Sequence, residues 1–300
     1  GFNRSETLLG LALYMGVFWT VKFNAYSPCN TDAIMGFFQM AILYLGLSGW
    51  YIPALVLLPI AVTAREQALL LAPALALMVM ERRGRRPVSN LTLAAAFPAA
   101  SVAAFLLIRY FITPARDYDS LGMVWKQLAI LGQCRFYPRI ALSLLSGLGA
   151  IPLLFLYRIR SRAWRFLLSP PWLVLTIGGM LSLFGGRDKA RLFLFILPLL
   201  VVVAVKMLVP GNRSPAWSWS LATGTLAMHL YLGYHLTPMT GFVAYLQRMV
   251  PMHAPDFTLP GALLRAGGVT ALWILFAGIH AAVFRKRPEI RNQETKEVSW

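Results

Sequence analysis

Apolar runs recur from one end of this 300-residue chain to the other. The hydrocarbon core of a bilayer needs about 20 apolar residues in a helix, and every backbone polar group inside it must be paired within the segment. The pattern therefore predicts an all-α fold, a polytopic transmembrane helical bundle with about ten apolar segments. These segments are Thr7–Ala25, Asp32–Ser48, Tyr51–Ala64, Gln67–Met80, Leu91–Ile112, Ile140–Tyr157, Trp172–Gly185, Leu192–Val209, Trp217–Leu236 and Ala262–Phe284.

Composition agrees with a membrane protein. Hydrophobic residues make up 58% of the chain and charged residues 13%, with a mean hydropathy of +0.63. A soluble domain carries about 25% charged residues. The net charge is +17, but the basic residues gather in short loops between apolar runs, which is the positive-inside pattern of membrane proteins. Nucleic acid is therefore not an expected partner, whereas membrane lipids are. The oligomeric state is left open.

Three basic blocks set the predicted orientation. An even number of crossings separates each pair of blocks, so all three can lie on the cytoplasmic side together. This predicts a transmembrane domain over residues 1–284 and a cytoplasmic basic tail over residues 285–300, in a bacterial inner membrane. The blocks are Arg82, Arg83, Arg85 and Arg86; Arg158, Arg160, Arg162 and Arg165; and Arg285, Lys286, Arg287, Arg291 and Lys296.

The remaining loops then face outward. Two of them, Thr113–Pro138 and Thr237–Gly261, carry apolar residues at roughly helical spacing and are expected to be outer interfacial helices. The alternative is that both are ordinary loops with interface-seeking aromatics. Cys29 and Cys134 also fall on the outer side, so a disulfide is open, although isolated membrane cysteines are more often small apolar residues.

Arg65 and Glu66 join two apolar pieces of about 14 residues each, which is short for a full crossing and suggests a tight or re-entrant hairpin. Charges at membrane depth are costly and usually face a polar cavity or each other. One interpretation is a turn whose charges snorkel to the head groups. The other is that Arg65 binds a phosphate group, and that Glu66 orients Arg65 or an acceptor.

Two further sites complete the candidate set. Asp32 opens an apolar span, where it is either a helix N-cap or first-turn acid, or a carboxylate that binds an acceptor hydroxyl, a metal ion or a cation. The segment Gly185–Arg191 contains Arg187, Asp188, Lys189 and Arg191 before a helix N-terminus, which suits an anion site. The alternative for this segment is a surface loop that touches lipid phosphates.

Other polar residues in apolar runs carry less information. Lys22 and Arg109 lie near outer ends, where they can snorkel or line the same cavity. His229 and His235 are expected to be structural. No zinc, Walker or nucleophile-elbow motif is present, so no metal-ligand set or cytosolic ATP chemistry is predicted. No cofactor is expected, although a divalent metal stays open.

Several of these segments resemble a known family. The run from Tyr26 through Asp32, then Trp50, then Ala64-Arg65-Glu66 and the apolar sequence ALLLAPALALM resembles the core of GT-C type integral-membrane glycosyltransferases. The sequence GGRDKARLFLFILPLL is similar to the later segment of that family, where a basic outer loop precedes an apolar helix. The likeness covers Thr7–Met80 and Leu183–Leu200, and its patterns are short.

The resemblance implies transfer of a sugar from a polyprenyl-phosphate carrier to an acceptor on the outer face. Arg65, Arg187 and Arg191, with Asp188 and Lys189 in the same loop, would hold the lipid-linked sugar donor. An acid, Asp32 or Glu66, would deprotonate or orient the acceptor hydroxyl. The sequence does not decide which of the two is the base.

One departure from the family affects these assignments. The principal acid of the family usually lies in a long first outer loop, whereas Tyr26–Thr31 is short. We expect that loop in an N-terminal part preceding Gly1. The alternatives are a transporter or flippase for an anionic lipid or solute, and a non-enzymatic membrane assembly partner.

Overall fold

A computed structural model describes residues 3–16, 32–81, 87–111, 147–182, 195–210, 214–235 and 259–284, together with Trp125, Ala129, Gln133, Ala141, Leu144 and Leu145. Within these ranges the side chains of residues 32–33, 87–88, 181–182, 233–235, 259–263 and 265–266 are not described.

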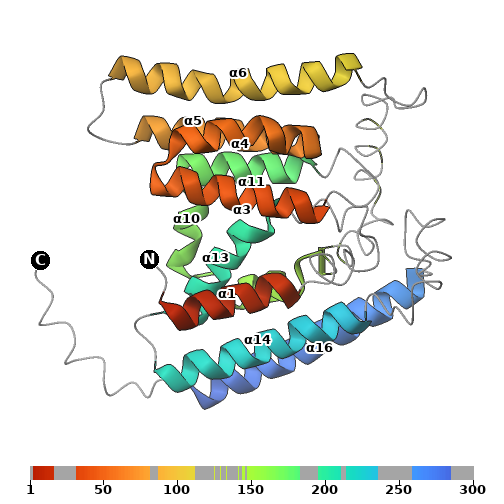
Figure 1. The fold of residues 1–300 in the computed structure, drawn as a ribbon. Coiled ribbons are helices and arrows are strands. Elements are labelled where there is room, and N and C mark those ends of the chain that lie inside the picture. Colours follow the sequence, from red (N-terminus) through yellow and green to blue (C-terminus); the bar gives the residue numbers. More distant parts are fainter. Residues whose placement is uncertain are drawn as a thin grey trace, which may run out of the picture.

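Regular secondary structure in the described residues is helical throughout, so the predicted all-α class is confirmed (Figure 1). In chain order the helices are α1 (Arg4–Gly16), α3 (Asp32–Ser48), α4 (Tyr51–Ala64), the 3₁₀ helix η1 (Glu66–Leu70), α5 (Leu71–Glu81), α6 (Pro87–Phe111), α9 (Ile151–Tyr157), the 3₁₀ helix η3 (Arg162–Trp164), α10 (Arg165–Leu168), α11 (Pro170–Ser182), α13 (Leu197–Leu208), α14 (Pro215–His235) and α16 (Leu259–Val283).

The helices form two groups. Helices α3, α4, α5, α6 and α11 pack against one another in the upper part of Figure 1, and α1, α9, α14 and α16 pack together in the lower part. Helix α13 contacts α1, α9 and α14 of the second group and α10, which leads into α11 of the first. The two groups are therefore joined through α13.

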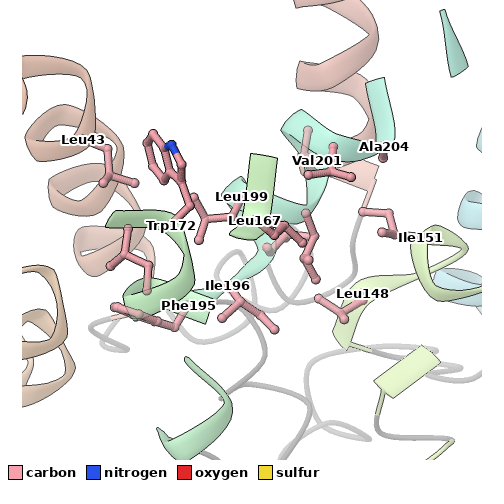
Figure 2. Close-up of a cluster of buried hydrophobic side chains, with 14 of the residues drawn as sticks. Leu43, Leu148, Ile151, Leu167, Trp172, Phe195, Ile196, Leu199, Val201 and Ala204 are labelled. Atoms are coloured by element: carbon pink, nitrogen blue, oxygen red, sulfur yellow. The ribbon is translucent and has the colours of Figure 1, made fainter. Parts of the chain in front are cut away.

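Helix α13 is buried along nearly its whole length; only Val202 is half-buried and only Lys206 is exposed. An all-round apolar helix is typical of a protein core. Figure 2 shows its first turns among side chains from the surrounding helices. The labelled members of this cluster are Leu43, Leu148, Ile151, Leu167, Trp172, Phe195, Ile196, Leu199, Val201 and Ala204.

The bundle has two ends that differ in chemistry. On the left of Figure 1, α5 ends, α6 begins, α14 begins, α16 ends and α10 lies nearby. These helix ends flank the three predicted basic blocks, and we call this the arginine end. The predicted outer loops are flanked by the opposite helix ends, including the α4–η1 junction at Arg65 and Glu66, and we call that the Glu66 end.

The hairpin expected around Arg65-Glu66 is present. Helix α3 and helix α4 have the predicted bounds, and the piece predicted over Gln67–Met80 is divided into η1 and α5. Because α4 has 14 residues, it extends only about 21 Å at 1.5 Å per residue, which is short of a hydrocarbon core of about 30 Å.

Length limits how many helices could cross a membrane. In the described part of the chain, one helix, over Ser89–Phe111, is both long and apolar enough to do so. Only 22% of its most apolar window is buried, so its apolar side chains face outward. The shorter apolar helices are Ile34–Ser48, Tyr51–Ala64, Leu197–Leu208 and Gly267–Val283. About ten crossing segments are therefore not borne out by helix length within the described residues.

The apolar segment predicted over Ile140–Tyr157 is helical in its described residues apart from the turn at Gly149, but it is not one continuous helix. The helical turn before Gly149 stops there, because Gly149 has φ of 60°, and α9 starts at Ile151 with a proline in its first turn. Glycine adopts this left-handed conformation without steric cost, and proline suits a helix start. The glycine therefore divides the apolar run into two helical pieces.

His229 of α14 seals this break. The Ala150 N–H donates to His229 Nδ1 at 3.1 Å, and His229 Nε2 lies 2.7 Å from the Leu13 carbonyl. A carbonyl only accepts, so Nε2 carries the proton and Nδ1 is the acceptor. The ring thus links α1, the turn at Gly149 and α14, which confirms the structural role expected for this histidine.

We predict that Gly149→Ala lowers the free energy of unfolding by about 2 to 4 kcal/mol, since left-handed alanine is strained and overpacking adds to that cost. A Cβ there would lie 2.1 Å from His229 Nδ1. Thermal unfolding in mild detergent measures the effect. The matched control is Gly267→Ala in α16, where a Cβ would meet nothing within 4 Å. Equal melting temperatures for the two variants would contradict the prediction.

Candidate functional site

The turn between α4 and η1 is made by one residue. Arg65 has extended backbone angles, with φ of −161° and ψ of 128°, and its side chain is half-buried. Its N–H donates to the Ala61 carbonyl at 2.9 Å, and its carbonyl accepts from the Ala68 N–H at 3.0 Å. Both backbone groups of Arg65 are thus satisfied locally, which fixes where the chain reverses.

An ion pair follows this turn directly. Glu66 Oε1 lies 2.5 Å from Arg109 Nη2. This ion pair joins η1 to the last turn of α6. The Arg109 guanidinium carbon also lies 5.4 Å from the centre of the Phe105 ring. The relative exposure is 28% for the Arg109 side chain and 47% for that of Glu66. At this exposure an ion pair contributes about 0.2–1 kcal/mol, so its main effect is to position the two groups.

The partner of Glu66 was not predicted from the sequence. Arg109 was expected near the outer end of its apolar run, at the same end as Arg65 and Glu66, and the ion pair places it there. Its contact with Glu66 is nevertheless new, because the pairing depends on α6 lying beside η1. The predicted roles of Glu66 toward Arg65 or an acceptor remain predictions.

The described structure covers the other predicted site residues only in part. Asp32 is the first residue of α3, as an N-terminal position predicts, but its side chain is outside the description. Arg187, Asp188, Lys189 and Arg191 lie in the interval 183–194, outside the described residues. So does Lys22.

The segments that flank this interval meet near η1. Gln39 of α3 is buried, and its Nε2 donates to the Phe195 carbonyl at 2.5 Å. On α11, a Cβ at Gly178 would lie 3.3 Å from Leu70 Cδ2 of η1, and one at Gly179 would overlap Ile196. Close packing at two consecutive glycines therefore holds the end of α11 against both η1 and the start of α13.

Helix α3, η1 and the segments that flank residues 183–194 therefore pack together, while the predicted gathering of Asp32, Arg65 and Arg187 around one pocket stays a prediction. The chemistry of this site depends on two described side chains, those of Glu66 and Arg109. They present a positioned carboxylate beside a guanidinium, a combination suited to accepting a hydroxyl proton and to binding an anion.

The remaining sequence predictions fall mostly outside the described residues. Cys29, Cys134 and the side chain of His235 are among them, as is nearly all of the two expected interfacial helices. Of Thr113–Pro138, Trp125 is helical and 70% exposed. Among the described residues, no group of three or more His, Cys, Asp or Glu side chains could hold a metal ion.

Comparison with known proteins adds no family. No protein-family model, no curated protein and no solved structure matches the chain.

We predict a coupling free energy of about 0.2–1 kcal/mol between Glu66 and Arg109, from a double-mutant cycle of Glu66→Gln, Arg109→Gln and the double variant. Equilibrium unfolding in mild detergent at low ionic strength gives the value, and salt should reduce it because the groups are partly exposed. The control cycle pairs Glu66→Gln with Arg4→Gln in the distant α1, where additivity is expected. Additive effects in both cycles would show that the ion pair contributes nothing.

Proposed function

We propose that the chain is a polytopic integral membrane protein of a bacterial inner membrane, with the arginine end and the C-terminus in the cytoplasm and the Glu66 end outside. The apolar exterior supports this. Helices α6 and α16 both carry many exposed large apolar side chains, and contiguous faces of this kind are rare on soluble monomers. On these two helices they are Leu91, Val102, Leu106, Leu107, Tyr110, Phe111, Leu264, Leu272, Ile274, Leu275, Ile279 and Val283.

Short helices fit this proposal if several segments enter the bilayer without crossing it alone. The α4–η1–α5 hairpin enters from the arginine end, and its turn at Arg65, supported by α6 and the Glu66–Arg109 pair, lines a polar cavity that opens to the outside. Non-helical backbone at membrane depth is tolerated where it is buried in protein or lines a polar cavity.

We further propose that the protein is a GT-C-like glycosyltransferase that moves a sugar from a polyprenyl-phosphate carrier to an acceptor on the outer face. The observation that carries this proposal is the Glu66–Arg109 ion pair at the α4–η1 turn, within the segment that resembles that family. Arg65, with Arg187, Asp188, Lys189 and Arg191, is proposed to bind the lipid-linked sugar donor, with the cations at the carrier phosphate.

In this reaction the acceptor hydroxyl oxygen forms a bond to the anomeric carbon, while the bond from that carbon to the carrier phosphate oxygen breaks. The hydroxyl proton passes to a carboxylate, Glu66 or Asp32, which acts as general base. The leaving phosphate keeps the bonding electrons, and guanidinium groups stabilise its charge. Arg109 is proposed to position Glu66 for this proton transfer.

The orientation predicts opposite labelling of two engineered cysteines. With Cys29 and Cys134 replaced by serine, Thr63→Cys should react with a membrane-impermeant maleimide in intact cells stripped of their outer membrane. Ser89→Cys should react only after permeabilisation. Thr63 lies beside the α4–η1 turn and Ser89 at the start of α6, and both are exposed. Labelling of both from the same side would overturn the proposed topology.

The activity predicts loss of sugar transfer on removal of either charged group at the turn. Membranes that contain the protein would be tested with a panel of radiolabelled polyprenyl-phosphate sugars. We expect Arg65→Ala and Glu66→Gln each to lower transfer by about 10²-fold or more, which is the size of a lost general base or oxyanion donor.

The matched control for this assay is Arg4→Ala, which removes one exposed charge in α1. It should transfer normally, and protein amount in the membrane should be equal for all variants. Normal transfer by both Arg65→Ala and Glu66→Gln would refute the assigned roles.

A transporter or flippase for an anionic lipid is a second candidate, favoured by the helix break at Gly149. Discontinuous helices are typical of secondary transporters. The break, however, is sealed by His229, which is bonded to Ala150 and Leu13. Movement of labelled lipid across proteoliposomes without any sugar product would favour this candidate over the enzyme.

A further inference from the structure

The segment Arg158–Ser169 connects α9 to α11 at the arginine end, and we call it the basic arm. The sequence predicts a loop here, but the segment contains η3 and α10. In Figure 1, α10 runs across the end of the bundle, whereas α5, α11 and α14 run along it. If the bundle spans a membrane, the basic arm therefore lies along the plane of the membrane surface.

Aromatic contacts fix the inner side of the basic arm. The Trp164 ring lies 4.5 Å from the Phe155 ring of α9, and the Phe166 ring stacks on Trp172 of α11 at 4.8 Å between centroids. Leu167 is buried and lies in the cluster around α13 (Figure 2). The arm is thus attached to three helices along its length.

Arg158 extends this attachment to α14. Its guanidinium carbon lies 4.9 Å from the centre of the Trp217 ring, at the start of that helix. The attachment is rigid because Trp217 packs on His280, with ring centroids 5.2 Å apart, and His280 accepts from the Tyr157 O–H at 3.0 Å. The first arginine of the arm therefore belongs to the packed part of the molecule.

The outer side of the arm combines charge with apolar surface. Arg160, Arg162 and Arg165 are exposed. Two apolar side chains beside them, Ile159 and Leu168, are also exposed, at 64% and 66%. Such a mixture is typical of segments that lie in the head-group region, with apolar side chains in the acyl boundary and cations at the phosphates.

The sequence on both sides of these arginines lacks acids. No Asp or Glu occurs between Asp119 and Asp188, an interval that contains the whole arm. Guanidinium groups bind phosphate oxygens through paired N–H donors, and a basic segment is attracted to an anionic leaflet. The exposed Ile159 and Leu168 favour a lipid surface over an acidic protein partner, because apolar side chains beside cations suit the boundary between head groups and acyl chains.

We propose that the basic arm binds the phosphate head groups of anionic phospholipids in the leaflet at the arginine end, through Arg160, Arg162 and Arg165. The inference depends on the proposed membrane placement but not on the proposed enzyme activity. It uses residues at the opposite end of the bundle from Glu66.

The test compares phospholipid preference in the full chain. Protein purified in detergent is mixed with micelles that contain spin-labelled phosphatidylglycerol or spin-labelled phosphatidylcholine, and the relative association constant is measured. We expect the wild-type protein to prefer phosphatidylglycerol. The preference should fall about fivefold for each arginine removed. The variants are Arg160→Gln, Arg162→Gln, Arg165→Gln and their triple combination. High salt should weaken the preference of wild type.

Two controls separate this site from general charge attraction. A tail variant with Arg285→Gln, Lys286→Gln and Arg287→Gln removes the same charge and should keep most of the preference. The triple lysine variant of the arm retains charge and should keep more of it than the triple glutamine variant. If the triple glutamine variant does not fold, the three single variants carry the test.

Three outcomes would overturn the proposal. One is an unchanged preference in the arm variants. Another is an equal loss in the tail variant, which would mean diffuse attraction. The third is full displacement of the lipid by inorganic phosphate, which would indicate a site for free anions. Labelling of both engineered cysteines from the same side would instead refute the membrane topology. Absence of sugar transfer would refute the proposed enzyme activity and leave the lipid result unaffected.

Discussion

The all-round burial of α13 is the constraint on which the described architecture depends. It contacts α1, α9 and α14 of one group and α10, which leads into α11 of the other, and only Val202 and Lys206 are not buried. A helix in this position cannot tolerate a polar face, because each buried unpaired group would cost about 1–3 kcal/mol. Pro198 at its start does no harm, since the first turn has no backbone donor to lose.

Polar side chains set the register where apolar packing is unspecific. In the proposed lipid environment apolar contact gives helices little reason to prefer one partner, so interhelical hydrogen bonds and small residues matter more. His229 bonds to two backbone groups of other segments and packs against Gly16 and Gly149. His280 lies 3.2 Å from the Trp217 carbonyl, and Trp273 donates to the Leu153 carbonyl at 3.0 Å. These bonds tie α14 and α16 to the short α9.

Hydropathy predicted most of the described helices, because glycine or charged residues interrupt the apolar runs at the positions where these helices end. The bounds of α3 and α4 follow from Gly49 and Trp50 on one side and the charged turn on the other. The break at Gly149 escaped prediction, since a lone glycine in an apolar run is usually tolerated within a helix. The arm helix was missed because arginines alternate with apolar residues over too few positions to give a period.

The sequence predicted only at which end of the bundle the candidate site lies. Alternation of basic loops placed Arg65, Glu66 and Arg109 at one end, and the structure has them there. Which cation meets Glu66 depends on how α6 packs beside η1, and no local pattern encodes that neighbour. The same holds for Gln39 and Phe195, which are 156 positions apart in the chain.

The 3₁₀ winding of η1 has a consequence for everything that follows it. A 3₁₀ helix turns about 120° per residue and an α-helix about 100°, so the five residues of η1 accumulate a twist of about 100° relative to continuous α-helix. The face that α5 presents to α6 and α11 is therefore rotated by more than a quarter turn from the one a single helical wheel would assign. If η1 were wound as α-helix, the packing surface of α5 would be rotated by this angle relative to the Glu66 carboxylate. The two would then no longer face their present neighbours together. The 3₁₀ segment therefore sets the rotation of α5 about its axis relative to Glu66. In one short hairpin, the charged turn and the apolar helix can thus contact different neighbours.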